Sequence, residues 1–396
     1  MFYAILSMAA GKLARKKPEM KVQALQYQSM ALSNLYADVS NASGWTKELL
    51  FVVLNLGLST SWHVITDLGI PHLKAMRGAM REKTVQKWCD SQTLRFFKDA
   101  LIYWEMVVCS VNDEAPVQSY PRADIPLPHI GQETEDTGSS RMSRIMPHPF
   151  TGAASAPQAL FGRLAHHIRQ VRPYNTGCTL SCPESFLESL DTLEEEVWQL
   201  ELPMLHEVAN TGDQSTPAIH HLLLVEAYMF ANLYQLYYAF PNRCQKRAKM
   251  IKERLQNGSF RQSCSWAEQQ AWSWSSLLLQ GTPKQWVEFL GRNTIMRLEQ
   301  IPITSGTTCI HPLLLLVGSG SLFVTTELEE TGEASEILRT RDFVLDRMTQ
   351  LSGLKLSEPI CQIKLVVVEI FKRLDLGIDV FWMDILHSMG VITIIG

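Results

Sequence analysis

The chain has 396 residues, of which 46% are hydrophobic and 19% are charged, and its formal net charge is −4. This composition is typical of a folded protein with a large core and excludes an intrinsically disordered chain. The near-neutral balance also excludes a basic surface for nucleic acid that extends over the whole chain.

The first residues and the apolar stretches do not indicate a membrane protein. Residues Met1–Leu6 are apolar but lack the positive segment that precedes the core of a signal peptide, and the basic residues of Lys12–Lys17 follow them instead. We interpret this basic cluster as a helix face rather than a nuclear-import signal. The longest apolar stretches, Leu49–Leu58 and Leu313–Val324, are shorter than the roughly 18 to 20 residues that cross a bilayer. We therefore expect no membrane association.

The pattern of apolar residues predicts helices from the start of the chain. A first helical segment covers Phe2–Leu13. A second pattern places Phe97, Leu101, Trp104 and Val108 on one face, because the steps of four, three and four follow the helical period.

The segment that begins near Leu190 has the same periodicity. Leu190, Leu193 and Val197 share one helix face, and Leu200 continues it. The intervening run Glu194–Glu196 is expected to face solvent.

Two longer helices are expected in the second half. Pro217 and Pro241 bound a segment in which Leu222, Val225, Met229, Leu233 and Leu236 form one apolar stripe. Near the end, Ile363, Val366, Ile370 and Leu374 repeat the spacing. The run Leu365–Val368 is also compatible with a strand, but the length of the segment and its charged residues favour a helix. No regular alternation bounded by hairpin turns is present, so the predicted class is all-α, a large array of packed antiparallel helices.

Two segments interrupt the helices. Residues 112–149 contain six prolines, several small residues and little periodic apolar content, which predicts a long, flexible surface loop. A shorter loop is expected over 173–183. The helices on both sides must still bury their apolar faces, so we predict one domain over 1–396 and no fixed internal repeat.

The sequence lacks the common motifs of catalysis. It has no Gly-rich phosphate loop and no Gly-x-Ser-x-Gly nucleophile motif. Gly318–Ser321 lacks the required lysine and is interpreted as a helix contact or turn. We predict no catalytic residues, and a helical enzyme of the terpene-synthase type is disfavoured because no aspartate-rich motif is present.

The histidines and cysteines do not predict a metal site either. His166–His167 are adjacent and therefore diverge on a helix, and His220–His221 are not spaced by four residues from Glu226; both pairs are expected to be packing or surface residues. Cys178 and Cys182 supply only two of the four ligands of a structural zinc site. The eight cysteines form no disulfide framework, which indicates an intracellular, reducing compartment. We therefore predict neither a metal nor a cofactor site in this chain.

Large aromatic residues are concentrated in two neighbouring segments. Tyr228, Phe230, Tyr234, Tyr237 and Tyr238 fall in one predicted helix, and Trp266, Trp272, Trp274 and Trp286 follow. Such clusters can line a pocket for a small apolar effector. A core packed with large side chains is the interpretation that we favour.

Several short motifs occur in a characteristic order along the chain. The first is Leu56–His63, which reads Leu-Gly-Leu-Ser-Thr-Ser-Trp-His, and the others are Leu68–Leu73, Phe96–Met106, Pro147–Gly152, Leu160–Leu164, Ile301–Leu314, Asp379–Asp384 and Thr393–Gly396. In this order the motifs resemble the fungal-specific transcription factor domain, over nearly the whole chain.

The resemblance implies a helical regulatory region and a role in transcription, in the nucleus. In that family a cluster of six cysteines binds zinc and DNA near the N-terminus, and a coiled coil often follows. This chain starts in the helical segment Phe2–Leu13 and has no six-cysteine motif, so either its start is truncated or it acts as a regulator without its own DNA-binding module. The expected partners are transcription machinery or other regulators, a second copy in a dimer, and a small-molecule effector that shifts a conformational equilibrium. The alternative is a helical protein–protein scaffold unrelated to transcription.

Overall fold

A computed structural model describes residues 1–41, 44–112, 144–171, 184–257, 281–324, 332–355 and 358–395, together with residues 266, 267, 270 and 274. The all-α prediction is confirmed, because this part of the chain is helical apart from turns, caps and two isolated β-bridges. In chain order the helices are α1 (Phe2–Ala14), α2 (Met20–Asn41), α3 (Lys47–His63), α4 (Ile70–Arg81), α5 (Lys83–Trp88), α6 (Ser91–Val111), α7 (Ser155–Val171), α8 (Glu184–Gln199), the 3-10 helix η1 (Leu205–Glu207), α9 (Ala218–Ala239), α10 (Pro241–Gln256), α13 (Pro283–Glu299), the 3-10 helix η2 (Gly306–Ile310), α14 (His311–Ser319), α16 (Glu333–Lys355), α17 (Glu358–Asp375) and α18 (Trp382–Ser388).

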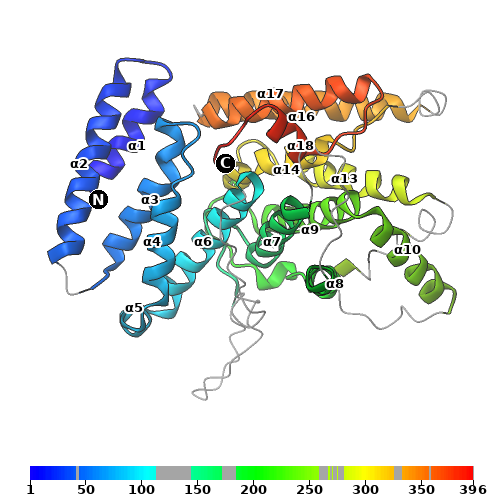
Figure 1. The fold of residues 1–396 in the computed structure, drawn as a ribbon, viewed down its shortest axis with the longest axis horizontal. Coiled ribbons are helices and arrows are strands. Elements are labelled where there is room, and N and C mark those ends of the chain that lie inside the picture. The colour runs from blue at the N-terminus through cyan, green and yellow to red at the C-terminus, as the bar shows by residue number, and fades with distance from the viewer. Residues whose placement is uncertain are drawn as a thin grey trace.

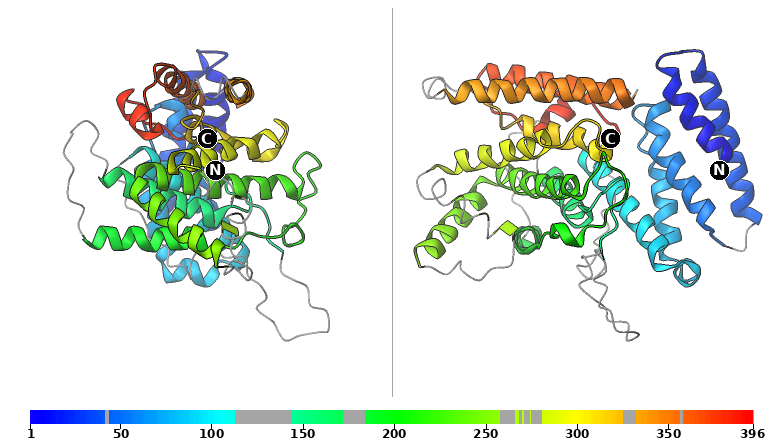
Figure 2. Two further views of the ribbon diagram at one scale, coloured as in Figure 1. Left: turned by 90° about the vertical axis from the view of Figure 1, so that its right-hand side faces the viewer. Right: turned by 180° about the vertical axis from the view of Figure 1, so that it is seen from behind.

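The helices form an elongated array with a distinct N-terminal end. Figures 1 and 2 show α1 and α2 as a hairpin at this end, with α3 and α4 beside it, whereas α10 lies at the opposite end. The paired helices α16 and α17 lie along one side of the array (Figure 1). The hairpin joins α3 through a small cluster that contains Ala4, Ala31, Val52 and Leu56. Small side chains therefore let these helices approach closely.

Helix α9 is the central element of the larger part of the array. It contacts α7, α8, α10, α13 and α14, and side chains on all its faces are buried from Leu224 to Tyr237. The sequence predicted one buried apolar stripe on this helix, and the structure shows that the other faces are buried too. A helix surrounded by neighbours buries its whole circumference, and the residues between the stripe positions here are also apolar or aromatic.

Local sequence signals start the helices where the structure places them. Thr46 caps α3 by accepting a hydrogen bond from the Leu49 amide, and Asp90 caps α6 through the Thr93 amide over 2.8 Å. At α13, Thr282 caps the helix and a proline follows it. These side chains satisfy amide groups that have no partner within the helix. The ambiguous run Leu365–Val368 lies within α17, which confirms the helical interpretation.

Two glycines allow α3 and the start of α4 to reach Trp104 on α6. A Cβ atom at Gly57 would lie 1.9 Å from the Trp104 ring, so no larger residue fits there. Gly69 has a φ of +65° and caps α4. The Trp104 indole donates a hydrogen bond to the Leu68 carbonyl over 3.2 Å. Three of the recognised motifs therefore meet at this one contact.

The predicted loop over 112–149 is only partly described. Asn112 caps α6, whereas residues 113–143 and the whole predicted loop over 173–183 lie outside the described residues. Residues 144–149 pack against the helices: Ile145 is buried and forms a parallel bridge with Val208. Flexibility between residues 113 and 143 remains a prediction.

Candidate effector cavity and partner surface

A cavity of about 400 Å³ lies between α9, α10, the first turns of α13, and the segments that follow α14 and α17. We call it the effector cavity, because it is the candidate site for the small-molecule effector expected from the sequence. Its size is within the range of small-molecule sites in proteins. The residues that line it are Tyr234, Tyr237, Tyr238, Pro241, Cys244, Gln245, Thr282, Pro283, Lys284, Val287, Glu288, Gly320, Ser321, Phe323, Gly377 and Asp379.

The tyrosines of the effector cavity are held by well-defined contacts. The Tyr238 hydroxyl donates a hydrogen bond to Asp379 over 2.7 Å, and its ring stacks on Phe381 with centroids 5.0 Å apart. Tyr237 packs against Trp286 at 5.1 Å. These contacts fix two aromatic side chains before any ligand is present, which reduces the entropy lost on binding.

Most of the aromatic clusters noted in the sequence form the core, as the favoured interpretation predicted. Tyr228 and Phe230 are fully buried, and Trp266 and Trp274 pack against Phe230. The three tyrosines at the end of α9 differ, because they also border the effector cavity. Trp272 lies outside the described residues.

Lys284, Glu288 and Asp379 are the charged residues in the lining of the effector cavity. Lys284 lies one turn before Glu288 on α13, and the distance between Nζ and Oε1 is 4.0 Å. Burial raises the pKa of Glu288, the charges of Lys284 and Arg292 lower it, and the charge of Asp379 raises it slightly. On the other wall, burial raises the pKa of the Cys244 thiol to about 12, so this cysteine stays neutral and unreactive.

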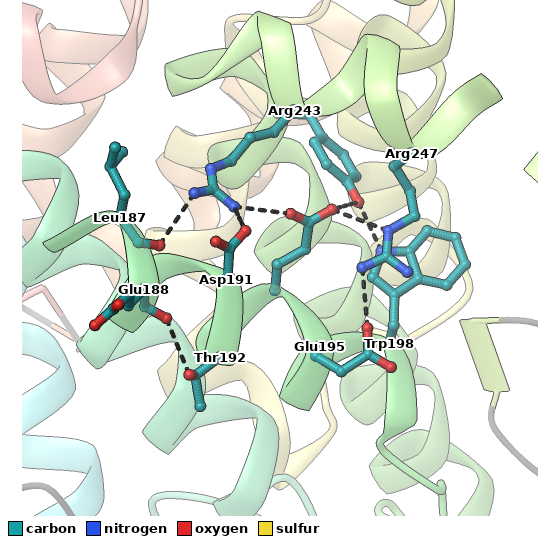
Figure 3. Close-up of polar contacts among 10 residues, drawn as sticks. Leu187, Glu188, Asp191, Thr192, Glu195, Trp198, Arg243 and Arg247 are labelled. Carbon is teal, nitrogen blue, oxygen red and sulfur yellow. Dashed lines mark hydrogen bonds and ion pairs between the residues drawn. The ribbon is translucent and has the colours of Figure 1, made fainter. Parts of the chain in front are cut away.

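The hydroxyl of Tyr237 belongs to a network of charged side chains that joins α8, α9 and α10 (Figure 3). Glu194 on α8 accepts a hydrogen bond from the Tyr237 hydroxyl over 2.9 Å and from Arg247 over 3.0 Å, and Arg243 lies 3.3 Å away. The Tyr237 hydroxyl accepts a hydrogen bond from the Trp198 indole over 2.6 Å. The Arg247 guanidinium lies 5.1 Å from the centroid of that indole.

This network corrects the expectation that Glu194–Glu196 face solvent. Only Glu195 is exposed, whereas Glu194 is buried and Glu196 pairs with Arg163 of α7. Glu194 can be buried because two arginines and a tyrosine satisfy its oxygens. The sequence signal for this pairing was the spacing of Arg243 and Arg247, which places both side chains on one face of α10.

A larger cavity of about 480 Å³ opens between the starts of α3 and α6 and residues 146–149. Its buried Asp99 already has a charged partner, because Arg95 lies 3.7 Å away on the same helix. Burial raises the pKa of Asp99 to about 6. We consider this cavity the weaker candidate, because its buried carboxylate already has Arg95 as a partner.

The outer face of α2 carries a row of exposed apolar residues. Val22, Leu25, Leu32, Tyr36 and Val39 are all exposed and follow steps of three and four, with Ser29 at the remaining position. We call these six residues the α2 stripe. It lies opposite the face that carries Ala24 and Ala31, the two residues that α2 buries. A stripe repeating every 3.5 residues is the pattern of a coiled-coil seam.

Both histidine pairs are packing residues, as the sequence indicated. His167 contacts the Arg163 carbonyl and the Ser189 hydroxyl, and His220 lies 3.1 Å from the Ser305 hydroxyl. His221 is buried, and burial lowers its pKa to about 4. Glu226, which lies on the same helix, forms an ion pair with Arg297 and not a metal site with these histidines.

The cysteines that the structure describes act mainly as small apolar residues. Cys89, Cys109 and Cys244 are buried free thiols, and Cys309 and Cys361 are half-buried. The pair Cys178 and Cys182 lies outside the described residues. Within the described ranges, no group of three or more His, Cys, Asp and Glu side chains is placed to hold a metal ion.

Gly318–Ser321 forms a close helix contact, as expected. A Cβ atom at Gly318 would lie 2.7 Å from Ile295 of α13, and one at Gly320 would lie 2.7 Å from the Tyr234 hydroxyl. This segment therefore lets α14 approach α13 and α9. Among the helices in the described part of the chain, none combines the length and apolar character needed to cross a membrane.

The recognised motifs lie far apart in the sequence but pack on one another. Tyr103 stacks on Phe150 with centroids 5.2 Å apart, and Phe161 stacks on Trp382 at 6.3 Å. Phe96 contacts His148 at 4.7 Å. The motif residues thus serve the packing of this helical array.

Comparison with known families agrees with this arrangement. The family model of the fungal-specific transcription factor domain matches residues 1–395. The chain belongs to the fungal-specific transcription factor domain family. This is a family of transcription regulators and not of enzymes. No curated protein and no solved structure shows significant similarity to the chain.

Proposed function

We propose that this chain is a helical regulatory domain that controls transcription in the nucleus. The observation that carries the proposal is the family match over residues 1–395, which leaves almost no part of the chain for another function. The packing of the family motifs on one another supports it, because these motifs then build one common interior. The genes that it controls would be selected by the DNA-binding module with which it acts.

We further propose that the protein forms a dimer through the α2 stripe. The stripe covers 18 residues from Val22 to Val39, about 26 Å of helix, and its apolar positions lie along one seam. Two copies related by a twofold axis would cover both stripes at once, because the same surface then serves as its own partner. The absence of charged residues from the seam favours an apolar, helical partner such as a second α2.

DNA recognition is assigned to another module. The net charge of −4 disfavours strong binding to phosphate, and the eight cysteines do not include a closely spaced group of six. A DNA-binding module outside these 396 residues, in the same protein or in a partner, would bring the chain to promoters. The alternative, a scaffold without a role in transcription, predicts the same fold but no effect on a gene.

Tethering tests the proposal against this alternative. The full chain is fused to a heterologous DNA-binding module and directed to a reporter gene in a fungal host, with the module alone as control. We expect a change in reporter transcript of at least about threefold, in either direction. Reporter transcript equal to that of the module alone, with the fusion folded and nuclear, would favour the scaffold.

A further inference from the structure

The effector cavity combines aromatic walls with an excess of negative charge. Tyr234, Tyr237, Tyr238 and Phe323 border it. Its charged lining groups are Lys284, Glu288 and Asp379, one positive and two negative, which gives a formal charge of −1. Aromatic rings and carboxylates both attract organic cations, the rings through their negative faces.

Lys284 offsets only part of this negative charge. Its side chain is 64% exposed, and its ammonium group is 4.0 Å from the Glu288 carboxylate, so the pair gains little in water. The same ammonium group lies 5.3 Å from the centroid of the Phe323 ring. An aromatic ring at the cavity therefore already interacts with a cation.

The two carboxylates are placed where a cation would stabilise them. The Glu288 side chain is only 22% exposed, and its burial raises its pKa although the charges of Lys284 and Arg292 act in the opposite direction; the charge of Asp379 adds a smaller rise. Asp379 is oriented by the hydrogen bond from Tyr238 over 2.7 Å. A positive group near both would offset the repulsion between them.

We propose that the effector cavity binds a small organic monocation with an apolar body, such as a protonated amine or a quaternary ammonium compound. The charged group would lie near Glu288 and Asp379, and the apolar part against the tyrosines of α9. A cavity of about 400 Å³ has room for such a molecule. That the ligand is an effector rests on the proposed function. Tyr237 would connect it to the Glu194 network, since its ring borders the cavity and its hydroxyl belongs to the network.

A matched pair of probes tests the proposal on the full chain. Benzyltrimethylammonium carries the positive charge, and neopentylbenzene has the same shape without it. We expect calorimetric titration to show one saturable site for the cation and binding of the neutral probe that is weaker by about tenfold or more. Equal affinity for the two probes, or a dissociation constant for the cation above about 1 mM, would overturn the proposal.

Variants locate the site. The double variant Glu288→Gln and Asp379→Asn keeps the shape of both side chains, and we expect it to weaken binding of the cation by about tenfold. The control Glu253→Gln removes one negative charge from an exposed position on α10 outside the cavity and should leave binding unchanged. Unchanged binding in the double variant would place the cation elsewhere and refute the assignment. Binding is measured without transcription, so failure here leaves the reporter result intact, and the reverse also holds.

Discussion

The Tyr237 hydroxyl donates a hydrogen bond to the Glu194 carboxylate over 2.9 Å, and this contact joins the effector cavity to the buried ion pairs of α8 and α10. Tyr237 is fully buried, and Glu194 is 6% exposed. A change in the position of α9 at the cavity would therefore alter the partners of a buried charge. Loss of this contact would leave the buried carboxylate without one of its hydrogen-bond donors, at a cost of about 1 to 3 kcal/mol.

We expect Glu194→Ala to destabilise the fold by about 2 to 4 kcal/mol, because it removes the acceptor of the buried Tyr237 hydroxyl and the shared carboxylate of Arg243 and Arg247, which keep only their exposed partners Asp191 and Glu195. Urea denaturation followed by circular dichroism measures this change. Glu188→Ala, on the exposed face of the same helix, is the control and should cost less than about 0.5 kcal/mol. Equal effects of the two substitutions would show that the network contributes nothing to stability.

The stability of the protein should fall in mild acid, partly because of His221. Its pKa is about 4 in the folded protein and about 6.5 when unfolded, so the unfolded state binds more protons between these values. The stability that comes from keeping His221 neutral is fully present above pH 6.5 and is lost as the pH falls toward 4. The loss amounts to at most about 3 kcal/mol.

His221→Leu should therefore make the free energy of unfolding depend less steeply on pH between 6.5 and 4. At pH 7.5 the variant should be as stable as the unaltered protein or slightly more so, because the imidazole nitrogens of His221 have no hydrogen-bond partner in the described structure. The substitution His206→Gln, at an exposed position, serves as the control. An unchanged slope in His221→Leu would contradict the burial of this side chain.

Substitution in the α2 stripe tests self-association. Tyr36 is 78% exposed, so Tyr36→Glu removes no packing within one chain but places a charge in the proposed seam. Light scattering after size exclusion should give about twice 44.8 kDa for the unaltered protein and 44.8 kDa for the variant. Gln23→Glu adds the same charge beside the seam and should leave the dimer intact. A monomer before any substitution would refute the dimer.

Several features could be predicted from the sequence because they depend on neighbouring residues. The helical class, the helix over Leu365–Val368 and the contact at Gly318 follow from periodicity, length and small side chains, which act locally. The family could also be recognised from its sequence motifs, although the residues of different motifs contact one another only in the folded chain. Their meaning as packing contacts, such as Gly57 against Trp104, required the structure.

Burial of polar groups could not be predicted in the same way. Glu194 sits between apolar positions on α8 and looks like a solvent-facing residue, and only the arrival of α10 places two arginines beside it. The number of buried positions on α9 was underestimated for the same reason, because the helices that surround α9 come from distant segments of the chain. The effector cavity combines residues from α9 to the segment after α17, so no local pattern marks it.

The purified chain should contain no stoichiometric zinc and should not bind duplex DNA sequence-selectively. Its isolated cysteines do not provide four ligands at the spacing of a zinc site, and its net charge is −4. Elemental analysis and a mobility-shift assay at physiological salt check these two expectations. One zinc ion per chain in the folded protein, or tight selective binding to a duplex, would contradict them.

The role in transcription is tested most directly by chromatin immunoprecipitation of the full chain from its native cells, combined with transcript levels after its removal. The account predicts enrichment at a limited set of promoters whose transcripts change when the protein is absent. A uniform background across the genome, with transcripts unaltered by its loss, would contradict it.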